Sequence, residues 1–241
     1  MHRFFIKKIS GNSASLTDAE QLHHLRDVLR LKINGRVILC DGLGGEYTGR
    51  IIAIDKKKAE LEVLPAAPAR TPSTGLTIAC AIPKNSRMDD VIDYLTQLGV
   101  NRIIPMRTDR VVVKLDAAAA KARLQRWRKI AVSAARQSQR NVIPEVEAIT
   151  NFADVVSASS KFDLKMIPHL SGDRKPIKDV LVEKKPKDII VLIGPEGDFT
   201  PAEVELALHN GFTPVSLGDT VLRVAAAAIA AAAYIRFSLD E

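Results

Sequence analysis

Short runs of alternating apolar and polar residues dominate the first part of the chain. The runs RVILCDG, EYTGRIIAID and KAELEVL, at residues 36–42, 46–55 and 58–64, are rich in β-branched side chains and are separated by Gly, Asp and Lys. Such spacing is typical of strands joined by hairpins in a small barrel or curled sheet. We therefore expect a β-rich N-terminal unit.

One helical pattern interrupts these strands at residues 15–31, SLTDAEQLHHLRDVLRL. Thr17 is the predicted N-cap, and Glu20 completes a capping box. Four apolar residues share the predicted buried face: Leu22, Leu25, Val28 and Leu29. The adjacent His23 and His24 point about 100° apart on a helix and no further ligands accompany them, so no metal site is predicted.

From residue 76 onward, continuous apolar runs alternate with amphipathic segments. The predicted strands are LTIACAI, RIIPM, DLKMIPH, DIIVLIG and PVSLG. Between the first two, residues 86–99 form a predicted helix that ends at Gly99. Its predicted buried face consists of Met88, Val91, Ile92, Leu95 and Leu98. Apolar strands alternating with helices predict an α/β fold in which a parallel sheet is covered on both faces.

The two patterns meet in the segment PAAPARTPSTG at residues 65–75. This segment has no hydrophobic period and is rich in Pro, Ala, Ser and Thr, which is typical of a linker. We therefore expect two domains, residues 1–70 and residues 74–241.

The strand DIIVLIG ends in the sequence Gly194-Pro195-Glu196-Gly197. The two glycines allow a positive φ or the close approach of a ligand to the main chain, and Pro195 stiffens the bend. No Lys-Ser/Thr pair follows the glycines, and Glu196 with Asp198 would repel a phosphate. The loop therefore suits a cationic or zwitterionic ligand, with a plain strand-to-helix turn as the alternative.

Two further signals favour a pocket at this loop. Thr200, Pro201 and Glu203 supply an N-cap, a first-turn proline and a capping-box acid, which would hold the loop rigid. The strand PVSLG also ends in a glycine, Gly218. Because ligands of open α/β sheets bind beyond the carboxyl ends of the strands, the two loops are expected to form one pocket.

Basic residues outnumber acidic ones by 35 to 28, and the formal net charge of +7 favours polyanionic partners. In residues 121–140, KARLQRWRKIAVSAARQSQR, one predicted helical face carries Leu124, Trp127, Ala131 and Ala134. The opposite face carries a basic stripe of Arg126, Lys129, Arg136 and Arg140. We expect this stripe to contact RNA phosphates, with a solvated charged face as the alternative.

The remaining composition argues against several other classes. Cys40 and Cys80 lie in apolar runs without metal-ligand spacing, which fits a reducing cytoplasm and predicts no metal centre. The longest apolar run, residues 224–235, is shorter than the ~20 residues that span a bilayer, so no membrane association is expected.

The motif LIGPEGDFTPAEVELALHNGFTPVSLGDTVLR, with MHRFF, HHLRDVLRLK and QLGVNRIIPMRTDRVVVK, resembles the ribosomal RNA small subunit methyltransferase E family. That family belongs to the SPOUT class of knotted methyltransferases. The resemblance implies a PUA-like β-barrel at residues 1–70, followed by a SPOUT domain with a C-terminal trefoil knot. It also implies a homodimer that uses S-adenosyl-L-methionine to methylate N3 of a uridine in 16S rRNA of the small ribosomal subunit.

Carried over by position, the resemblance implies a cofactor pocket that acts mostly through main-chain groups and apolar contact with the adenine. The implied residues are Pro168, His169, Ile193, Gly194, Pro195, Glu196, Gly197, Leu217, Gly218 and Leu222. At His169 the main chain is expected to matter more than the ring.

Methylation of N3 makes a further chemical demand, because uracil N3 attacks a methyl group well only as its proton leaves and the charge on its carbonyl oxygens is stabilised. Arginine supplies such stabilisation, and Arg140 and Arg223 are the predicted catalytic residues. Arg3 is a weaker third choice for this role, and it joins Arg126, Lys129 and Arg136 as a predicted RNA contact. No general base is evident.

The chain departs from the family pattern where the family usually has acids. Gln97, Arg136 and Ala225 stand at three such positions, Tyr94 replaces a lysine, and Gln139 replaces the glycine before Arg140. The alternative function is therefore a catalytically impaired RNA-binding or ribosome-assembly protein on the same fold.

Overall fold

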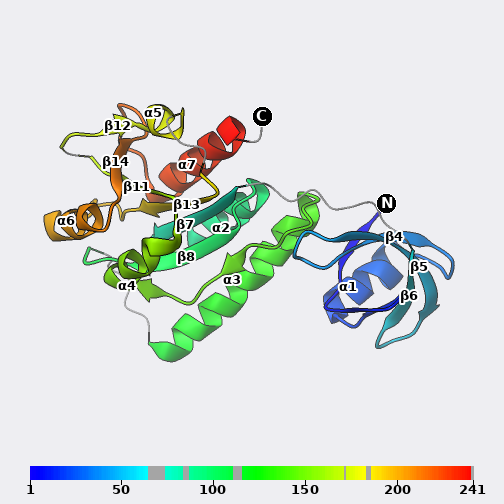
Figure 1. Cartoon of the computed structure of the whole chain (residues 1–241). Helices are drawn as coiled ribbons and strands as arrows, with labels where there is room; N and C mark the ends of the chain where they lie inside the picture. Colours follow the sequence, from blue (N-terminus) through cyan, green and yellow to red (C-terminus); the bar gives the residue numbers. More distant parts are fainter. Residues whose placement is uncertain (65–73, 84–86, 111–115, 171, 183–185, 240–241) are drawn as a thin grey trace. The chain divides into compact units, whose positions relative to one another are not determined.

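The computed structural model of the protein describes residues 1–64, 74–83, 87–110, 116–170, 172–182 and 186–239. Figure 1 traces the chain, which divides into two compact units. The first unit comprises Met1–Thr71 with Ala135–Ile143, and the second comprises Pro72–Ala134 with Pro144–Glu241. Residues 65–73 of the predicted linker lie outside the described residues, so the boundary between 70 and 74 stays a prediction. The segment Ala135–Ile143 belongs to the first unit, although its position in the sequence suggested the second.

The first unit is a six-stranded sheet with a helical segment packed against it. Its strand order is β1-β4-β5-β6-β3-β2, in which β1 pairs parallel with β4 and the other pairs are antiparallel. The strands are β1 (Arg3–Phe5), β2 (Ile9–Ser10), β3 (Ser13–Leu16), β4 (Arg36–Cys40), β5 (Glu46–Ile54) and β6 (Ala59–Leu64). The sheet curls around the helical segment, whose Leu22 and Leu25 join a core with Phe4, Leu39 and Leu61 (Figure 1).

This helical segment differs from its prediction in two ways. It consists of α1 (Ala19–His23) and a π-helix, η1 (His24–Val28), and its N-cap is Asp18 rather than Thr17. The Asp18 carboxylate accepts a hydrogen bond from the Gln21 N–H at 3.0 Å. In η1 the Leu29 N–H donates to the His24 carbonyl five residues back. The wider turn shifts the buried face, so Val28, predicted to be buried, is 56% exposed.

The second unit is built on an eight-stranded sheet whose pairs are all parallel. Its order is β10-β8-β7-β13-β11-β14-β12, and β9 also pairs with β8. The strands are β7 (Gly75–Ala81), β8 (Arg102–Arg107), β9 (Glu145–Val146), β10 (Thr150–Asn151), β11 (Leu164–Pro168), β12 (Lys175–Pro176), β13 (Asp188–Ile193) and β14 (Thr213–Ser216). The mixed α/β fold with a parallel sheet is therefore confirmed.

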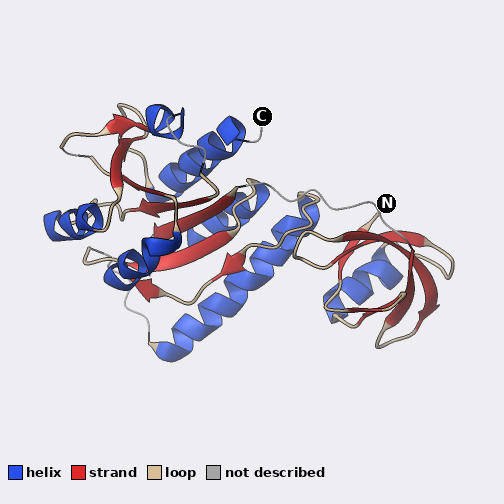
Figure 2. Cartoon of the chain, in the orientation of Figure 1, coloured by secondary structure: helices blue, strands red, loops and turns tan. Residues whose placement is uncertain are grey.

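Helices cover both faces of this sheet, as Figure 2 shows. They are α2 (Arg87–Gln97), α3 (Ala117–Gln137), α4 (Phe152–Ser157), η2 (Ala158–Lys161), α5 (Ile177–Val182), α6 (Pro201–His209) and α7 (Val224–Leu239). On one face α4 and α6 supply Phe152, Val155 and Ala207 to a core that includes Ile104 and Leu192 of the sheet. Alternate strand residues point to the other face, where α7 packs on β7, β13 and α2.

The predicted helix faces of the second unit are largely confirmed. In α2, Met88, Val91, Ile92 and Leu95 are buried, Leu98 is half-buried, and Gly99 has the positive φ of +88° that a helix end requires. In α3, Trp127, Ala131 and Ala134 are buried and Leu124 is half-buried. The buried faces of α2 and α3 therefore lie where the sequence predicted them.

Candidate functional site

Three strand-end loops of the second unit meet at one cavity. Strands β13, β11 and β14 are adjacent and parallel, so their carboxyl ends lie side by side. Nine of the ten residues predicted for the cofactor pocket line the cavity: Pro168, His169, Ile193, Gly194, Pro195, Glu196, Leu217, Gly218 and Leu222. The tenth, Gly197, lies in the loop after β13 but does not line the cavity. Residues separated by more than fifty positions are thus brought to one place by the strand order.

The three glycines of these loops have different roles. Gly218 has a φ of +123°, which favours glycine. Gly194 and Gly197 do not have a positive φ, and the positive φ in their loop belongs to Asp198, at +62°. A Cβ at Gly194 would lie 3.0 Å from Phe199 Cε2, whereas a Cβ at Gly197 would meet only Arg110 Cδ, at 3.5 Å. Close packing, rather than backbone conformation, therefore requires glycine at position 194.

Hydrogen bonds hold this loop from two sides. Asp198 accepts bonds from the main-chain N–H groups of Leu170 and Phe199, both at 2.9 Å, which ties the loop after β13 to the loop after β11. On the other side, Arg110 Nη1 donates to the Gly197 carbonyl at 2.5 Å and contacts the Phe199 carbonyl at 3.5 Å. Nothing in the sequence signals the contact of Arg110 with Gly197 or the bond from Leu170 to Asp198, because each joins loops that are remote in sequence.

The predicted start of α6 is confirmed and extends this support. The Thr200 hydroxyl accepts from the Glu203 N–H, and the Glu203 carboxylate accepts from the Thr200 N–H, a complete capping box. The other oxygen of Glu203 accepts from the Asp109 N–H at 3.0 Å. The loop after β8 therefore supports both the Gly194–Asp198 loop and the helix that follows it.

The cavity carries both signs of charge. Glu196 and Asp198 line it together with Arg174, which donates to the His169 carbonyl at 2.9 Å. Burial lowers the pKa of His169 from its usual value, the Asp198 charge raises it, and the Arg174 charge lowers it. Within the described part of the chain, His169 Nδ1 is buried and has no hydrogen-bond partner. A neutral imidazole and opposite charges around an apolar wall suit a zwitterionic ligand.

Neither cysteine is placed for nucleophilic chemistry. Cys80 lies at the end of β7, where burial and the charge of Glu196 raise its pKa to about 12. Burial also raises the pKa of Cys40, against the lowering effect of Arg3. Both thiols therefore stay protonated at neutral pH.

The predicted basic stripe is partly engaged in ion pairs. Arg126 pairs with Asp89 at 2.5 Å, and the same carboxylate accepts a bond from the Trp127 indole N–H at 3.1 Å. Arg136 pairs with Glu20 of the first unit at 3.1 Å. Lys129 is exposed on the same helix. The stripe is thus less positive than its sequence indicates.

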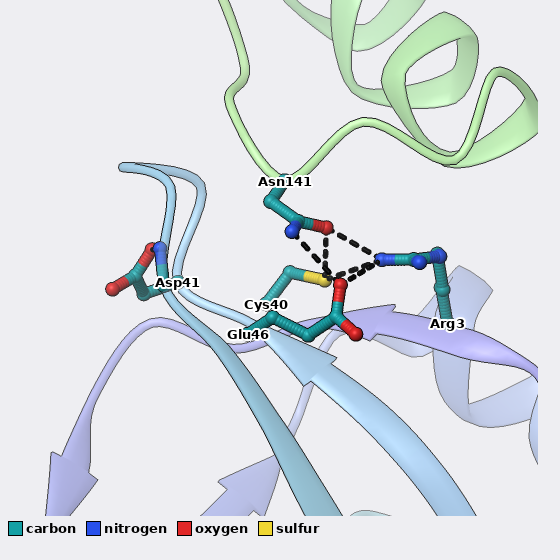
Figure 3. Close-up of polar contacts among 6 residues, drawn as sticks. Arg3, Cys40, Asp41, Glu46 and Asn141 are labelled. Atoms are coloured by element: carbon teal, nitrogen blue, oxygen red, sulfur yellow. Dashed lines mark hydrogen bonds and ion pairs between the residues drawn. The ribbon is translucent and has the colours of Figure 1, made fainter. Parts of the chain in front are cut away.

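The predicted arginines that do not lie on α3 are found in different surroundings, and Arg140 is one of them because α3 ends at Gln137, before the last member of the predicted stripe. Arg3 forms a polar cluster with Glu46, Cys40 and Asn141 in the first unit (Figure 3). Arg140 belongs to the same unit, just after the end of α3. Arg223 is exposed at the start of α7 in the second unit. The two predicted catalytic arginines are therefore carried by different units.

Comparison with known proteins matches this architecture along almost the whole chain. The family model described as RNA methyltransferase domain matches residues 70–236, and the model described as RNA methyltransferase PUA domain matches residues 16–64. The ribosomal RNA small subunit methyltransferase E of Synechocystis is 31% identical over 98% of this chain and 76% of its own length. The chain belongs to the ribosomal RNA small subunit methyltransferase E family.

Further proteins are similar to this chain over nearly its whole length. The Bacillus subtilis methyltransferase E is 28% identical over 100% of this chain and 98% of its own. The solved methyltransferase E from Neisseria gonorrhoeae, bound to S-adenosyl methionine, has a TM-score of 0.86 at 29% identity and covers 99% of this chain and 98% of its own. A solved structure from Legionella pneumophila with bound cofactor SAM has a TM-score of 0.86 at 30% identity, covering 98% and 97%. The expected family and PUA domain are thus confirmed.

The described residues hold no candidate membrane span and no candidate metal site. Among the helices that the structure describes, none is long and apolar enough to cross a membrane. The same residues contain no group of three or more His, Cys, Asp or Glu side chains that could hold a metal ion.

Proposed function

We propose that this protein is an S-adenosyl-L-methionine-dependent methyltransferase that methylates N3 of a uridine in 16S rRNA of the small ribosomal subunit. The observation that carries the proposal is that nine of the ten predicted cofactor residues line one and the same cavity. Solved relatives with this fold bind S-adenosyl methionine, which supports the choice of ligand. The choice of N3 rests on the family resemblance and on the arginine chemistry below.

Different residues of the cavity suit different parts of the cofactor. Main-chain groups at Gly194 to Glu196 and at Leu217 and Gly218 would hold the adenine and ribose. The carboxylates of Glu196 and Asp198 suit the sulfonium and the α-ammonium group, and the Arg174 guanidinium suits the α-carboxylate. When bound, S-adenosylmethionine supplies an electrophilic methyl carbon on its sulfonium.

The arginines act on the other reactant. For N3 to take the methyl group that S-adenosylmethionine would supply, the uracil must lose its N3 proton, and the sequence shows no general base for this step. As N3 loses its proton, negative charge spreads to the flanking carbonyl oxygens. We assign Arg140 and Arg223 to stabilise this charge, which makes their contribution larger in the transition state than in the ground state.

RNA binding is assigned to the first unit and to the exposed part of α3. The match to a PUA domain supports the first assignment. The exposed side chains of Arg126 and Lys129 support the second. Arg3 and Arg136, predicted as further RNA contacts, are ion-paired with Glu46 and Glu20 within the first unit.

A homodimer, a C-terminal trefoil knot and a cytoplasmic location belong to the same proposal. Three large side chains on α2 and α7 stay exposed: Tyr94 at 49%, Tyr234 at 41% and Phe237 at 70%. The two helices pack together, so these residues suit an interface between two copies of the chain. Light scattering of wild-type protein and Phe237→Glu tests the assignment, with a dimer expected only for the wild type.

Two experiments test the proposed function. Calorimetry with S-adenosylmethionine and S-adenosylhomocysteine should give binding to a single site per chain. Mass mapping of 16S rRNA from cells lacking the protein should show one uridine without its methyl group, restored by the wild-type gene. Binding of RNA without heat from millimolar cofactor would instead support a non-catalytic RNA-binding or ribosome-assembly protein.

A further inference from the structure

The loop between β4 and β5 has a shape fixed by its own residues. The Asp41 carboxylate accepts bonds from the Leu43 N–H at 2.8 Å and the Gly45 N–H at 2.9 Å. Gly42 and Gly44 have φ values of +77° and +113°, which favour glycine. A Cβ at Gly45 would collide with the Asp41 carboxylate. The loop Asp41–Gly45 is therefore preformed.

This loop pairs with a segment about a hundred residues away in sequence. The Gly44 N–H donates to the Asn141 carbonyl at 3.2 Å, and the Ile143 N–H donates to the Gly42 carbonyl at 2.9 Å. A Cβ at Gly42 would lie 3.1 Å from Ile143 Cδ1, so glycine there allows the close approach. The segment Asn141–Ile143 thus lies along the loop in a short β-like pairing.

Side chains close this contact through a triangle of hydrogen bonds (Figure 3). Arg3 Nη1 donates to Glu46 Oε2 at 2.7 Å and to Asn141 Oδ1 at 2.5 Å. Asn141 Nδ2 donates to the same Glu46 oxygen at 2.8 Å. Hydrogen bonds from Arg3 and Asn141 lower the pKa of Glu46, which keeps the carboxylate charged at neutral pH. The Arg3 side chain is 17% exposed, so little of it faces an external phosphate.

Along the chain, Arg140 lies between Asn141 of this triangle and Arg136, which forms a second ion pair of the first unit. Upstream, Arg136 pairs with Glu20, and the Arg140 N–H donates to the Ala135 carbonyl at 2.9 Å, closing the end of α3. Gln139 adopts a φ of +59° to make that turn. Downstream, Asn141 is held by Arg3 and Glu46. The main chain of Arg140 is thereby fixed on both sides.

We propose that Arg3 is a positioning residue for methyl transfer: with Glu46 it holds Asn141, and so sets the direction from which the adjacent Arg140 reaches the uridine. Arg3 then acts inside the protein and not as a phosphate contact. The first unit then contributes to turnover by holding Arg140 in position, in addition to binding RNA. The inference rests on the proposed catalytic role of Arg140.

The test compares Arg3→Ala, Asn141→Ala and their double variant with Arg50→Ala. Arg50 is a matched control because it also pairs with a glutamate of the same sheet, Glu62, at 2.5 Å. Arg3→Ala and Asn141→Ala should each lower kcat by about tenfold, since a small misplacement of a catalytic group is enough for such a loss. The double variant should lose no more than either single one, because both changes open the same triangle.

Two further measurements separate positioning from RNA contact. The salt dependence of RNA binding should be the same in Arg3→Ala and wild type, whereas loss of a phosphate contact lowers its slope by about one unit. Arg3→Lys should recover only part of the turnover, because an ammonium cannot reproduce the fixed fork of a guanidinium. A lowered slope, or additive losses in the double variant, would overturn the proposal.

Hydrogen exchange distinguishes failure of this inference from failure of the assigned role of Arg140. The amides of Gly44 and Ile143 should exchange faster in Arg3→Ala and Asn141→Ala, and at the wild-type rate in Arg50→Ala. Unchanged protection in the first two variants would show that Arg3 does not hold the segment. If protection is lost while Arg140→Ala turns over at the wild-type rate, the triangle stands as a structural device and the catalytic assignment of Arg140 fails.

Discussion

The cavity proposed to bind the cofactor and the triangle of Arg3, Glu46 and Asn141 are built in different ways. The cavity is formed by the ends of neighbouring strands within one parallel sheet, and its lining combines glycines and apolar side chains with His169, Arg174, Glu196 and Asp198. The triangle joins residues 3, 46 and 141 through side-chain atoms. A site made from main chain follows from the fold and tolerates many side chains nearby, whereas a site made from side chains is lost with any one of them.

The largest expected effect is the loss of turnover when Arg140 is replaced. Arg140→Ala should lower kcat by roughly a hundredfold, about 3 kcal/mol, while RNA affinity changes little, because a guanidinium aimed at a uracil carbonyl gains most when the base becomes anionic. Single-turnover methylation with saturating cofactor and RNA measures it.

Arg223→Ala is the comparison from the other unit. Arg223 lies next to Leu222 of the cavity wall, and its carbonyl accepts the Ala227 N–H in the first turn of α7. Loss of cofactor binding in Arg223→Ala, with turnover alone lost in Arg140→Ala, would assign the two residues different roles. Wild-type turnover in both variants would remove both from catalysis.

The second effect concerns packing behind the cavity. Gly194→Val should weaken cofactor binding by about 2 kcal/mol, or ~30-fold, because its side chain must displace the buried Phe199 ring. That ring packs against Phe152, with centroids 5.3 Å apart, and has little room to move. Gly197→Ala is the matched control, since its Cβ meets only the flexible Arg110 side chain. Calorimetry decides, with circular dichroism confirming the fold; equal affinities would contradict the packing argument.

The contrast also explains what the sequence could predict. The strands, the cavity loops and the capping box of α6 are signalled by adjacent residues, and they were found. The end of α3 was not, because nothing in QSQRN indicates that Asn141 pairs with a loop a hundred residues earlier. The π-helix η1 was missed for a related reason: residues 24–28 carry an ordinary helical pattern, and the wider turn is visible only in its hydrogen bonds.

The third prediction concerns the hydrogen bond by which Arg110 supports the Gly194–Asp198 loop. Arg110→Ala should weaken cofactor binding by about 1 kcal/mol, roughly fivefold, because an exposed charged hydrogen bond to Gly197 contributes at the lower end of its range. Arg107→Ala, which removes an exposed arginine three residues earlier, should bind as wild type. If the two variants have the same affinity, the contact with Gly197 does not support the loop.

The fourth prediction concerns the RNA surface of α3. Lys129→Ala should lower the slope of RNA affinity against salt concentration by about one unit, as one phosphate contact is lost. Arg126→Ala should lower it by less, because Arg126 is already paired with Asp89. Cofactor affinity should stay constant in both variants. An unaltered slope for Lys129→Ala would mean that this face is only solvated.

The smallest expected effect is a change in the titration of one histidine in the cavity. Because burial lowers the pKa of His169, its imidazole should titrate at a pH below the usual midpoint of about 6.5. The native state then binds that proton less readily than the unfolded state, so the contribution to stability is complete above the unfolded pKa and is lost as the pH falls through the folded one. Nuclear magnetic resonance of the ring Cε1–H gives the midpoint, and His169→Asn identifies the signal.

Two neighbours of His169 make this titration a probe of the cavity. Asp198→Asn should lower the midpoint further, because the aspartate charge favours the protonated ring, and Arg174→Gln should raise it, because the guanidinium disfavours that form. Addition of S-adenosylhomocysteine should shift the His169 signal, since the ring lines the cavity assigned to the cofactor. A midpoint above 6.5 would show that the Asp198 charge outweighs burial. A signal unmoved by the ligand would place the cofactor away from His169, and the walls of the site would then be the loops after β13 and β14 alone.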